Sequence, residues 1–151
     1  MNVKESSFVL LNVLSLKQVV EIKKWTEPAI ALRNHVVTEG IYPVGPVAFE
    51  KQELENEPDH AEYTFYLPLN VNIEINDQSP YEFTDIMALP ETLCVRYSDY
   101  DGDISVAYDT LRNYAEEKKL ELADSFYHVS LDVYGEIWLD IHAPIIGKGH
   151  E

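Results

Sequence analysis

Apolar residues recur at the spacing of an α-helix in two stretches of the chain, and the pattern is clearer in the later one. There, one apolar face is made by Ile104, Ala107, Tyr108, Leu111 and Ala115. Because residues three and four positions apart lie on the same side of a helix, this spacing predicts an amphipathic helix. Asp103 precedes it and can accept hydrogen bonds from the free N–H groups of the first turn. Lys118 and Lys119 complement the helix dipole at the other end.

Another helix is predicted earlier in the chain, from about Thr26 to Gly40. Thr26 can cap free N–H groups, and Pro28 loses no hydrogen bond when it lies in the first turn. Apolar positions continue through Val36 and Val37. Gly40 suits the backbone conformation that ends many helices.

Around these helices the pattern changes to short runs rich in β-branched and aromatic residues, which favour strands. The predicted strands cover residues 8–14, 17–25, 44–50, 62–67, 83–89, 92–98, 125–131 and 136–142. Turn-forming or polar clusters lie at residues 53–59, 76–80 and 132–135, and the first of these is expected to be an exposed hairpin loop. Because no long flexible linker interrupts the pattern, we expect a single domain over residues 1–151.

The order of elements repeats and predicts two similar halves, at about residues 7–75 and 83–146. Each half has a strand, a helix and then two strands, the last of which ends near a proline. The helices share the tripeptide Leu-Arg-Asn, at residues 32–34 and 111–113. Matching landmarks in the same order indicate an internal repeat. The fold class predicted from these patterns is α+β.

The last third of the chain contains a predicted β-hairpin. If residues 132–135 form a four-residue loop, Tyr127 faces Asp140 and Val129 faces Trp138 across the antiparallel pair. Successive side chains of a strand point to opposite faces of the sheet. One face of this hairpin is mostly aliphatic, and we expect it to pack on the helices.

The opposite face of the hairpin combines aromatic rings with ionisable groups. Its members are Tyr127, Glu136, Trp138, Asp140 and His142, and the first half has a weaker equivalent in Glu62, Thr64 and Tyr66. Flat rings supply contact area and carboxylates set orientation or charge preference, so the mixture suits a ligand-binding surface. One face of an antiparallel sheet is also often just solvated, and this alternative stays open.

The net charge is −16, with only 11 Lys and Arg among 151 residues. This charge limits the kinds of molecule that the chain is expected to bind. Phosphate binding needs clustered basic residues, so direct binding of nucleic acid is not expected. An acidic field favours cationic ligands and basic protein partners, and it also keeps a protein soluble. No stretch is apolar for long enough to cross a bilayer, and the first residues lack the pattern of a secretory signal. We therefore expect no membrane association and a cytoplasmic location.

The sequence gives little support for metal, cofactor or thiol chemistry. Cys94 lies in an apolar-leaning segment, where a structural thiol is expected. Asp140, His142 and Glu136 alternate along one strand, and such residues do not converge on one ion without further ligands. We expect no metal site and no cofactor.

Several short motifs occur in order over nearly the whole chain. The first half has Leu32-Arg33-Asn34-His35, Gly40-Ile41 and Gly45-Pro46. The second half has Leu89-Pro90, a turn with Gly102, and residues 114–120 and 137–145. Together they resemble the gyrase-inhibitor-like (GyrI-like) family, which includes effector-binding domains of multidrug-sensing transcription regulators.

The resemblance implies two pseudo-symmetric strand–helix–strand–strand units. Their strands would form a curved antiparallel sheet with both helices on one face and a ligand groove, between the halves, on the other. The family's closing strand commonly has a glutamate, four residues before its proline, that often contacts a cationic ligand. The matching residue here is Asp140, one methylene shorter. Another recurrent glutamate lies two residues before a tyrosine, where this chain has Ser125 before Tyr127.

Three functions stand as alternatives. The first is a stand-alone small-molecule (effector) binding protein whose ligand is apolar or aromatic, with a positive charge as one option. Its ligand would be held by Asp140, Trp138, Tyr127, Glu136, His142, Tyr66 and Glu62. The second is an acidic interaction module that binds a basic protein, of the inhibitor, immunity or secretion-accessory type.

The third alternative is a hydrolase, an activity of some members of the resembled family, with Asp140 as base and Tyr127 as proton donor. The sequence contains no nucleophile elbow, phosphate loop or zinc motif, so binding is favoured over catalysis. A monomer and a homodimer are both compatible with the pattern.

Overall fold

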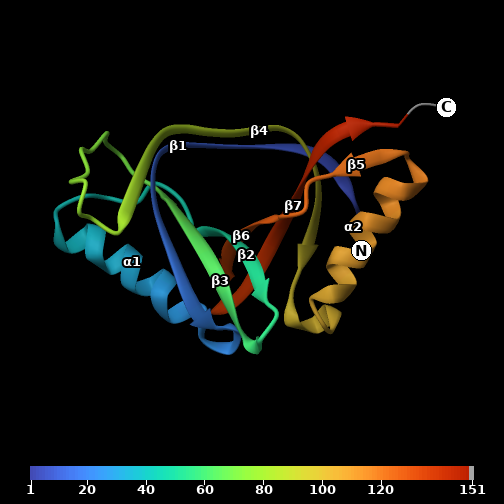
Figure 1. Ribbon diagram of the computed structural model, residues 1–151, viewed down its shortest axis with the longest axis horizontal. Helices are drawn as coiled ribbons and strands as arrows, with labels where there is room; N and C mark the ends of the chain where they lie inside the picture. Colours follow the sequence, from blue (N-terminus) through green and yellow to red (C-terminus); the bar gives the residue numbers. More distant parts are fainter. Residues whose placement is uncertain (150–151) are drawn as a thin grey trace. The chain divides into compact units, whose positions relative to one another are not determined.

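Antiparallel strands make up most of the computed structural model, which describes residues 1–149 (Figure 1). The strands are β1 (Lys4–Glu21), β2 (Ala48–Leu54), β3 (Glu57–Pro68), β4 (Tyr81–Tyr97), β5 (Leu120–Leu122), β6 (Tyr127–Val133) and β7 (Glu136–Lys148). The helices are α1 (Thr26–Thr38) and α2 (Ser105–Glu117), and two short 3-10 helices are η1 (Ile22–Lys24) and η2 (Asp99–Asp101). The predicted α+β class, with an antiparallel sheet and two α-helices, is confirmed.

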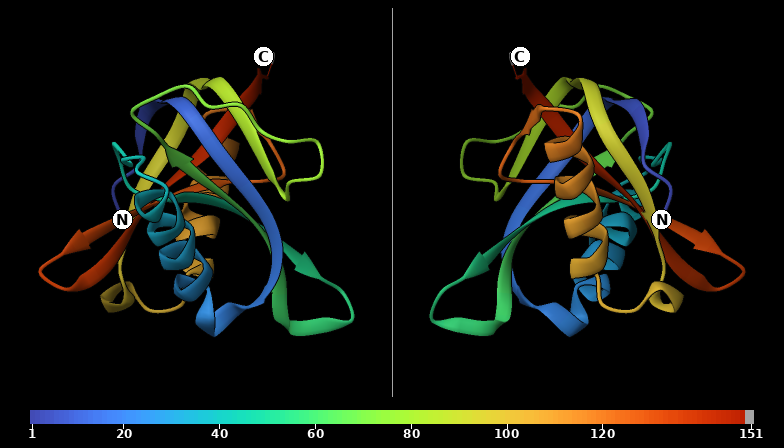
Figure 2. Two further views of the ribbon diagram at one scale, coloured as in Figure 1. Left: turned by 90° about the vertical axis from the view of Figure 1, so that its left-hand side faces the viewer. Right: turned by 90° about the vertical axis from the view of Figure 1, so that its right-hand side faces the viewer.

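The chain divides into two compact units. Unit 1 contains Met1–Val9 and the chain from Ala88 onward, and unit 2 contains Leu10–Met87. Strands β1 and β4 contribute residues to both units. Each unit has its own hairpin, β2–β3 in teal and green and β6–β7 in orange and red (Figure 2).

In unit 2, α1 begins and ends where the sequence predicts. Thr26 is its first residue, so the capping role predicted for Thr26 is wrong: the cap position is Trp25, and it makes no side-chain cap hydrogen bond. Gly40 follows the end of the helix with a φ of 78°. The N–H of Gly40 donates to the carbonyl of Val37, and the N–H of Ile41 donates to that of Val36, at 3.1 and 3.0 Å. These two bonds satisfy carbonyl groups that the last turn leaves free, which is why a glycine is needed there.

The core of unit 2 lies between α1 and β3. The buried side of α1 presents Ala29, Leu32 and Val36. Along β3, buried and half-buried residues alternate from His60 to Leu67. The rings of Tyr63 and Phe65 are stacked, with centroids 5.5 Å apart, and Phe49 of β2 packs against both. This environment excludes water, and burial raises the pKa of the Tyr63 hydroxyl to about 12.

In unit 1, α2 covers the aliphatic face of the β4–β7–β6 sheet. Asp103 Oδ1 accepts a hydrogen bond from the N–H of Ser105 at 2.8 Å, so the predicted capping residue is confirmed. The buried residues of α2 are Ala107, Leu111 and Ala115. Tyr108, also on α2, shares a hydrogen bond of 2.7 Å with His128 of β6. The face that carries His128 is therefore the face that packs on the helix.

Several predicted boundaries are wrong. Residues 8–14 and 17–25 belong largely to one continuous strand, β1, and residues 83–89 and 92–98 to another, β4, which runs through Pro90. The predicted loop at 53–59 is shorter, because β2 and β3 pair as far as Leu54 and Glu57. A proline is tolerated in a strand where the ladder does not require its missing N–H group.

The predicted register of the β6–β7 hairpin is also wrong. Tyr127 lies opposite His142, and not Asp140, while Val129 lies opposite Asp140. The loop contains Tyr134 and Gly135 alone, both with positive φ, where four residues were predicted. The pairing therefore differs by two residues. Because side chains alternate with a period of two, this shift leaves every residue on its predicted face.

No helix within residues 1–149 has the length and apolar character that a membrane span requires.

Candidate functional site

Three strands of unit 1 place a set of polar and aromatic side chains on the face opposite α2. Strand β7 lies between β4 and β6 in this part of the unit. We call this surface the Asp140 face. Its residues are Thr92, Cys94 and Arg96 of β4, Trp138, Asp140 and His142 of β7, and Tyr127, Val129 and Leu131 of β6.

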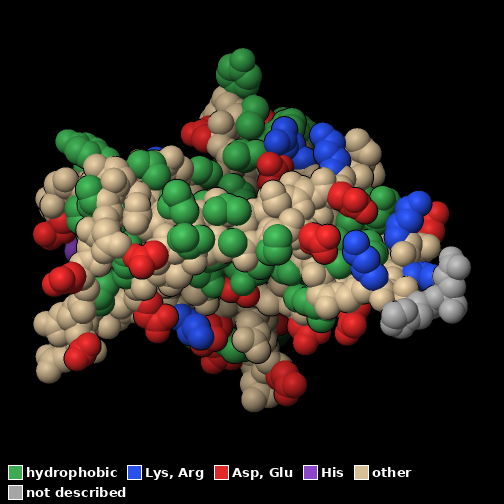
Figure 3. Space-filling model, turned by 90° about the horizontal axis from the view of Figure 1, so that it is seen from above, with side chains coloured by type: hydrophobic (Ala, Val, Ile, Leu, Met, Phe, Trp, Pro, Cys, Tyr) green, Lys and Arg blue, Asp and Glu red, His purple; other side chains and the backbone are tan. Residues whose placement is uncertain are grey.

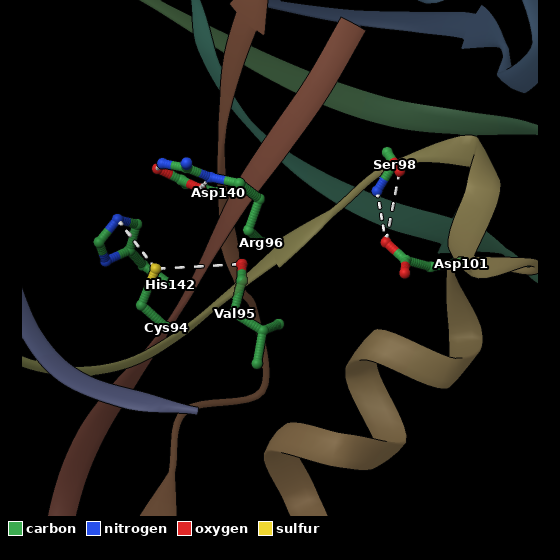
Figure 4. Close-up of polar contacts among 7 residues, drawn as sticks. All are labelled: Cys94, Val95, Arg96, Ser98, Asp101, Asp140 and His142. Atoms are coloured by element: carbon green, nitrogen blue, oxygen red, sulfur yellow. Dashed lines mark hydrogen bonds and ion pairs between the residues drawn. The ribbon is translucent and has the colours of Figure 1, made fainter. Parts of the chain in front are cut away.

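Asp140 forms a two-point ion pair with Arg96. The two residues lie directly opposite each other in the β4–β7 pairing. Arg96 Nε donates to Oδ1 at 2.8 Å and Nη2 donates to Oδ2 at 3.1 Å (Figure 4). The Asp140 side chain is 23% exposed and that of Arg96 is 58% exposed. The hydrogen bond and the charge of Asp140 raise the pKa of the guanidinium further, so Arg96 carries its positive charge at neutral pH.

His142 is held between Thr92 and Cys94. Its Nδ1 shares a hydrogen bond of 2.9 Å with Thr92 Oγ1. Its Nε2 lies 3.7 Å from the Cys94 Sγ (Figure 4). Burial lowers the pKa of His142, against a smaller opposing effect of Asp140, so the imidazole is neutral at pH 7.

Cys94 is a half-buried thiol with low nucleophilicity. Burial is the main cause that raises its pKa to about 11, and Asp140 adds to the effect while Arg96 and Lys4 oppose it. Since the thiolate is the nucleophile, only a very small fraction of Cys94 is reactive at pH 7. The structural role predicted for Cys94 agrees with this environment.

Aromatic rings lie beside His142. Tyr127, opposite His142 on β6, packs its ring against Phe8 of β1 with centroids 5.9 Å apart. Phe8 also packs on the His142 ring, at 5.2 Å. Phe8 is buried and Tyr127 is half-buried, so they form one edge of the Asp140 face.

Trp138 has a polar atom without a partner. It lies two residues before Asp140 on β7 and therefore on the same face. Its Nε1 is buried, and within the described part of the chain no hydrogen-bond acceptor is in reach. Buried N–H groups in native proteins are nearly always bonded, so such a donor calls for an explanation.

The other predicted site residues form contacts that involve neither Arg96 nor Asp140. Glu136 is exposed at the end of the hairpin and accepts a hydrogen bond from Tyr100 at 2.6 Å. Glu62 and Tyr66 belong to β3 in unit 2, where both are half-buried. The Tyr66 hydroxyl donates a short hydrogen bond to a Glu50 carboxylate oxygen.

The sequence pattern predicts four members of the Asp140 face and does not predict the others. Tyr127, Trp138, Asp140 and His142 do share one face. Arg96 was missed because its partner lies 44 residues further along the chain. The signal that points to it is the matching alternation of residues 92–98 and 136–142, once these two strands are paired.

Unit 1 also contains a pocket of about 410 Å³ whose lining includes neither Arg96 nor Asp140. Its lining residues are Glu5, Ser6, Ser7, Pro90, Glu91, Thr92, Leu120, Ile145 and Lys148. Thr92 is the one member of the Asp140 face among them. Across residues 1–149 no group of three or more His, Cys, Asp and Glu side chains is placed to hold a metal ion.

Comparison with known proteins gives a family and a fold. A family model described as "Domain of unknown function (DUF5085)" matches residues 9–146. None of the curated proteins matches the chain in sequence.

Among solved structures, the EcmrR C-terminal domain is similar with a TM-score of 0.71 and 13% identity, covering 99% of this chain and 100% of that one. A hydrolase from Listeria innocua has a TM-score of 0.57 and 10% identity, with 94% and 91% covered. SAV2435 bound to tetraphenylphosphonium has a TM-score of 0.50 and 12% identity, with 97% and 95% covered. Likeness at these identities concerns the fold, and it supports the GyrI-like fold that the sequence motifs implied.

Proposed function

We propose that this chain, which belongs to the family of the domain of unknown function DUF5085, binds a small apolar or aromatic molecule through the Asp140 face. The observation that carries the proposal is the buried Trp138 Nε1, which has no acceptor among the described residues. A ligand that accepts a hydrogen bond from this group would remove the cost of a buried, unbonded donor, about 1–3 kcal/mol.

The composition of the Asp140 face favours the same function. Ligand sites are mostly apolar and aromatic, with a few polar groups that fix orientation. The Asp140 face has this composition, since Tyr127 and Trp138 supply rings, Phe8 of β1 packs on Tyr127, and the Arg96–Asp140 pair supplies the polar element. Most of these side chains are half-buried, which distinguishes the face from a fully solvated one.

The fold adds support of a general kind. SAV2435, which shares the fold, is bound to tetraphenylphosphonium, an aromatic compound. EcmrR carries this fold as its C-terminal domain. The sequence analysis also offers a cationic ligand, a basic protein partner and a hydrolase activity. These three remain predictions from the sequence alone.

The test is a thermal-shift screen followed by calorimetry. Aromatic cations, neutral aromatics and aromatic acids are screened separately against the purified chain. A ligand present at 100 times its dissociation constant stabilises the folded state by about 2.7 kcal/mol, which such a screen detects.

The matched variants are Trp138→Phe and Trp25→Phe. Trp138→Phe keeps a ring and removes the N–H group, and we expect it to weaken the best hit by roughly tenfold. Trp25 packs on Phe49 in the core of unit 2, so Trp25→Phe should leave the affinity unchanged. Equal affinity of wild type and Trp138→Phe would remove Trp138 from the site. The absence of any hit in all three classes would count against the function itself.

A further inference from the structure

We propose that Arg96 determines the ligand class of the Asp140 face by occupying the Asp140 carboxylate. The face then accepts aromatic ligands that are uncharged or acidic and discriminates against lipophilic cations. This inference rests on the proposed function, and it reverses the charge preference that a free carboxylate at position 140 would give.

The geometry of the pair leaves Asp140 little capacity for a second cation. Both carboxylate oxygens accept hydrogen bonds from one planar guanidinium, at 2.8 and 3.1 Å. Two-point contacts of this kind are among the strongest that charged side chains make. Because Arg96 and Asp140 are cross-strand neighbours, the sheet itself brings them together, and Figure 4 shows the two side chains facing each other.

An incoming cation therefore meets a pair, and not a lone negative charge. At the distance of a direct contact with Asp140, the cation also lies close to the positive guanidinium, and the repulsion offsets most of the attraction. To bind the Asp140 carboxylate directly, the ligand must displace the Arg96 guanidinium, which the sheet holds beside it. A tethered competitor acts at a high effective concentration, so free ligand displaces it poorly.

The N–H groups on this face that are not bonded to Asp140 favour uncharged or acidic ligands, which can accept hydrogen bonds. A guanidinium has five N–H groups, and the contact with Asp140 uses two of them. Arg96 is 58% exposed, so the remaining groups can reach a ligand. Trp138, on the same face, contributes the buried N–H without an acceptor in residues 1–149. Lys4 is close enough to lower the pKa of Cys94, although burial raises that pKa overall, so a second cation lies near this surface.

The experiment compares two probes of nearly equal size and shape but opposite charge, tetraphenylphosphonium and tetraphenylborate. Their dissociation constants are measured by calorimetry at about 150 mM salt, where the long-range field of the chain is largely screened. The proteins are wild type, Arg96→Gln, Asp140→Asn and the double variant. Lys24→Gln serves as control, because Lys24 is an exposed residue of unit 2 and its loss changes the net charge by the same amount.

We expect wild type to prefer tetraphenylborate. Arg96→Gln frees the carboxylate, and the ratio of the two dissociation constants should shift toward the phosphonium by roughly 100-fold. Asp140→Asn leaves Arg96 unpaired and should strengthen tetraphenylborate binding. The double variant should discriminate little between the probes, and Lys24→Gln should behave as wild type.

Each other outcome is decisive. If wild type binds the phosphonium as tightly as Arg96→Gln does, the inference is wrong and the proposed function stands. If neither probe binds any of the proteins, this inference fails, and the screen of the three ligand classes decides the proposed function separately. A shift in Lys24→Gln equal to that in Arg96→Gln would assign the effect to net charge and overturn the role of Arg96. A cooperative urea unfolding transition shows that each variant is folded. If Arg96→Gln does not fold, the dissociation constants of Asp140→Asn test whether the ion pair sets the charge preference.

Discussion

His142 is buried between Thr92, Cys94 and the ring of Phe8, and these contacts determine its charge. The Nδ1 and Nε2 atoms both face neutral groups, at 2.9 Å from the Thr92 hydroxyl and 3.7 Å from the Cys94 thiol. Charging the ring would require a proton in a site from which water is excluded, which is why its pKa is lowered. His142 thus acts as a neutral link between β4 and β7.

This environment predicts a pH dependence of stability. In the folded state the pKa of His142 lies below its ordinary value of 6.5, whereas the unfolded chain keeps the ordinary value. As the pH falls through 6.5 the unfolded state gains a proton that the folded state does not, so the free energy of unfolding decreases. The contribution is fully present above pH 6.5. Urea unfolding of wild type between pH 7.5 and pH 5.5 should show this decrease.

The comparison that isolates His142 uses His142→Gln and His60→Gln. The first variant should lose part of the slope between pH 6.5 and pH 5.5, whatever its stability at pH 7.5. The second removes a half-buried histidine of β3 and should keep the slope of wild type. A wild-type slope in His142→Gln would contradict a buried neutral imidazole.

At the scale of elements, the β6–β7 turn explains why the hairpin register differs from the predicted one. Tyr134 and Gly135 have φ values of 52° and 83°, the left-handed conformation that two-residue hairpin turns require. The N–H of Gly135 also donates to Asp132 Oδ1 at 3.0 Å. Two residues therefore suffice for the turn, and the flanking residues Asp132 and Val133 extend β6.

The turn makes a prediction about two substitutions. A Cβ at Gly135 would meet no atom within 4 Å, so Gly135→Ala changes the backbone preference alone. We expect it to lower the free energy of unfolding by about 1 kcal/mol, because alanine disfavours positive φ. Asparagine tolerates this conformation better than tyrosine, so Tyr134→Asn should raise the free energy of unfolding by roughly 0.5 kcal/mol. Both are measured by urea unfolding.

Equal stability of Gly135→Ala and wild type would mean that this turn does not adopt the left-handed conformation in solution. Gly45→Ala is a useful contrast, because there the added Cβ would lie 3.1 Å from Pro68 Cγ. Its effect is steric and belongs to unit 2, so the two glycine substitutions test different physical causes.

For the whole molecule, the dominant property is the excess of negative charge. The chain has 27 acidic and 11 basic residues. Figure 3 shows acidic side chains spread over the face in view, and they are not gathered in one patch. Like charges at such density repel one another in the compact state and oppose folding.

Salt should therefore stabilise the protein. Raising sodium chloride from about 20 mM to about 300 mM shortens the screening length and weakens this repulsion. We expect a gain of about 1 kcal/mol, which corresponds to roughly 2–4 °C in the midpoint of thermal unfolding for a chain of this size. Choline chloride at equal ionic strength is the control, and it should give the same shift if screening is the cause. A midpoint that stays constant or falls would mean that ion pairs outweigh the repulsion.

The sequence by itself determined the features that depend on local periodicity. The helix spacing located α1 and α2, and Gly40 and Asp103 marked ends that the structure confirms. The alternation in the last hairpin sorted Tyr127, Trp138 and His142 onto one face. It did so although the register was wrong, because a shift of two residues leaves alternation unchanged.

Tertiary structure alone decided which side chains meet. Arg96 reaches Asp140 because β4 pairs with β7, and Phe8 reaches His142 from a strand more than a hundred positions earlier. No local pattern encodes such pairings, since many strand partners satisfy the same alternation and only the packed sheet selects one. This pairing sets the charge of the candidate site. The sequence pattern presents the Asp140 carboxylate as free, whereas in the folded chain it is bound by Arg96 of another strand.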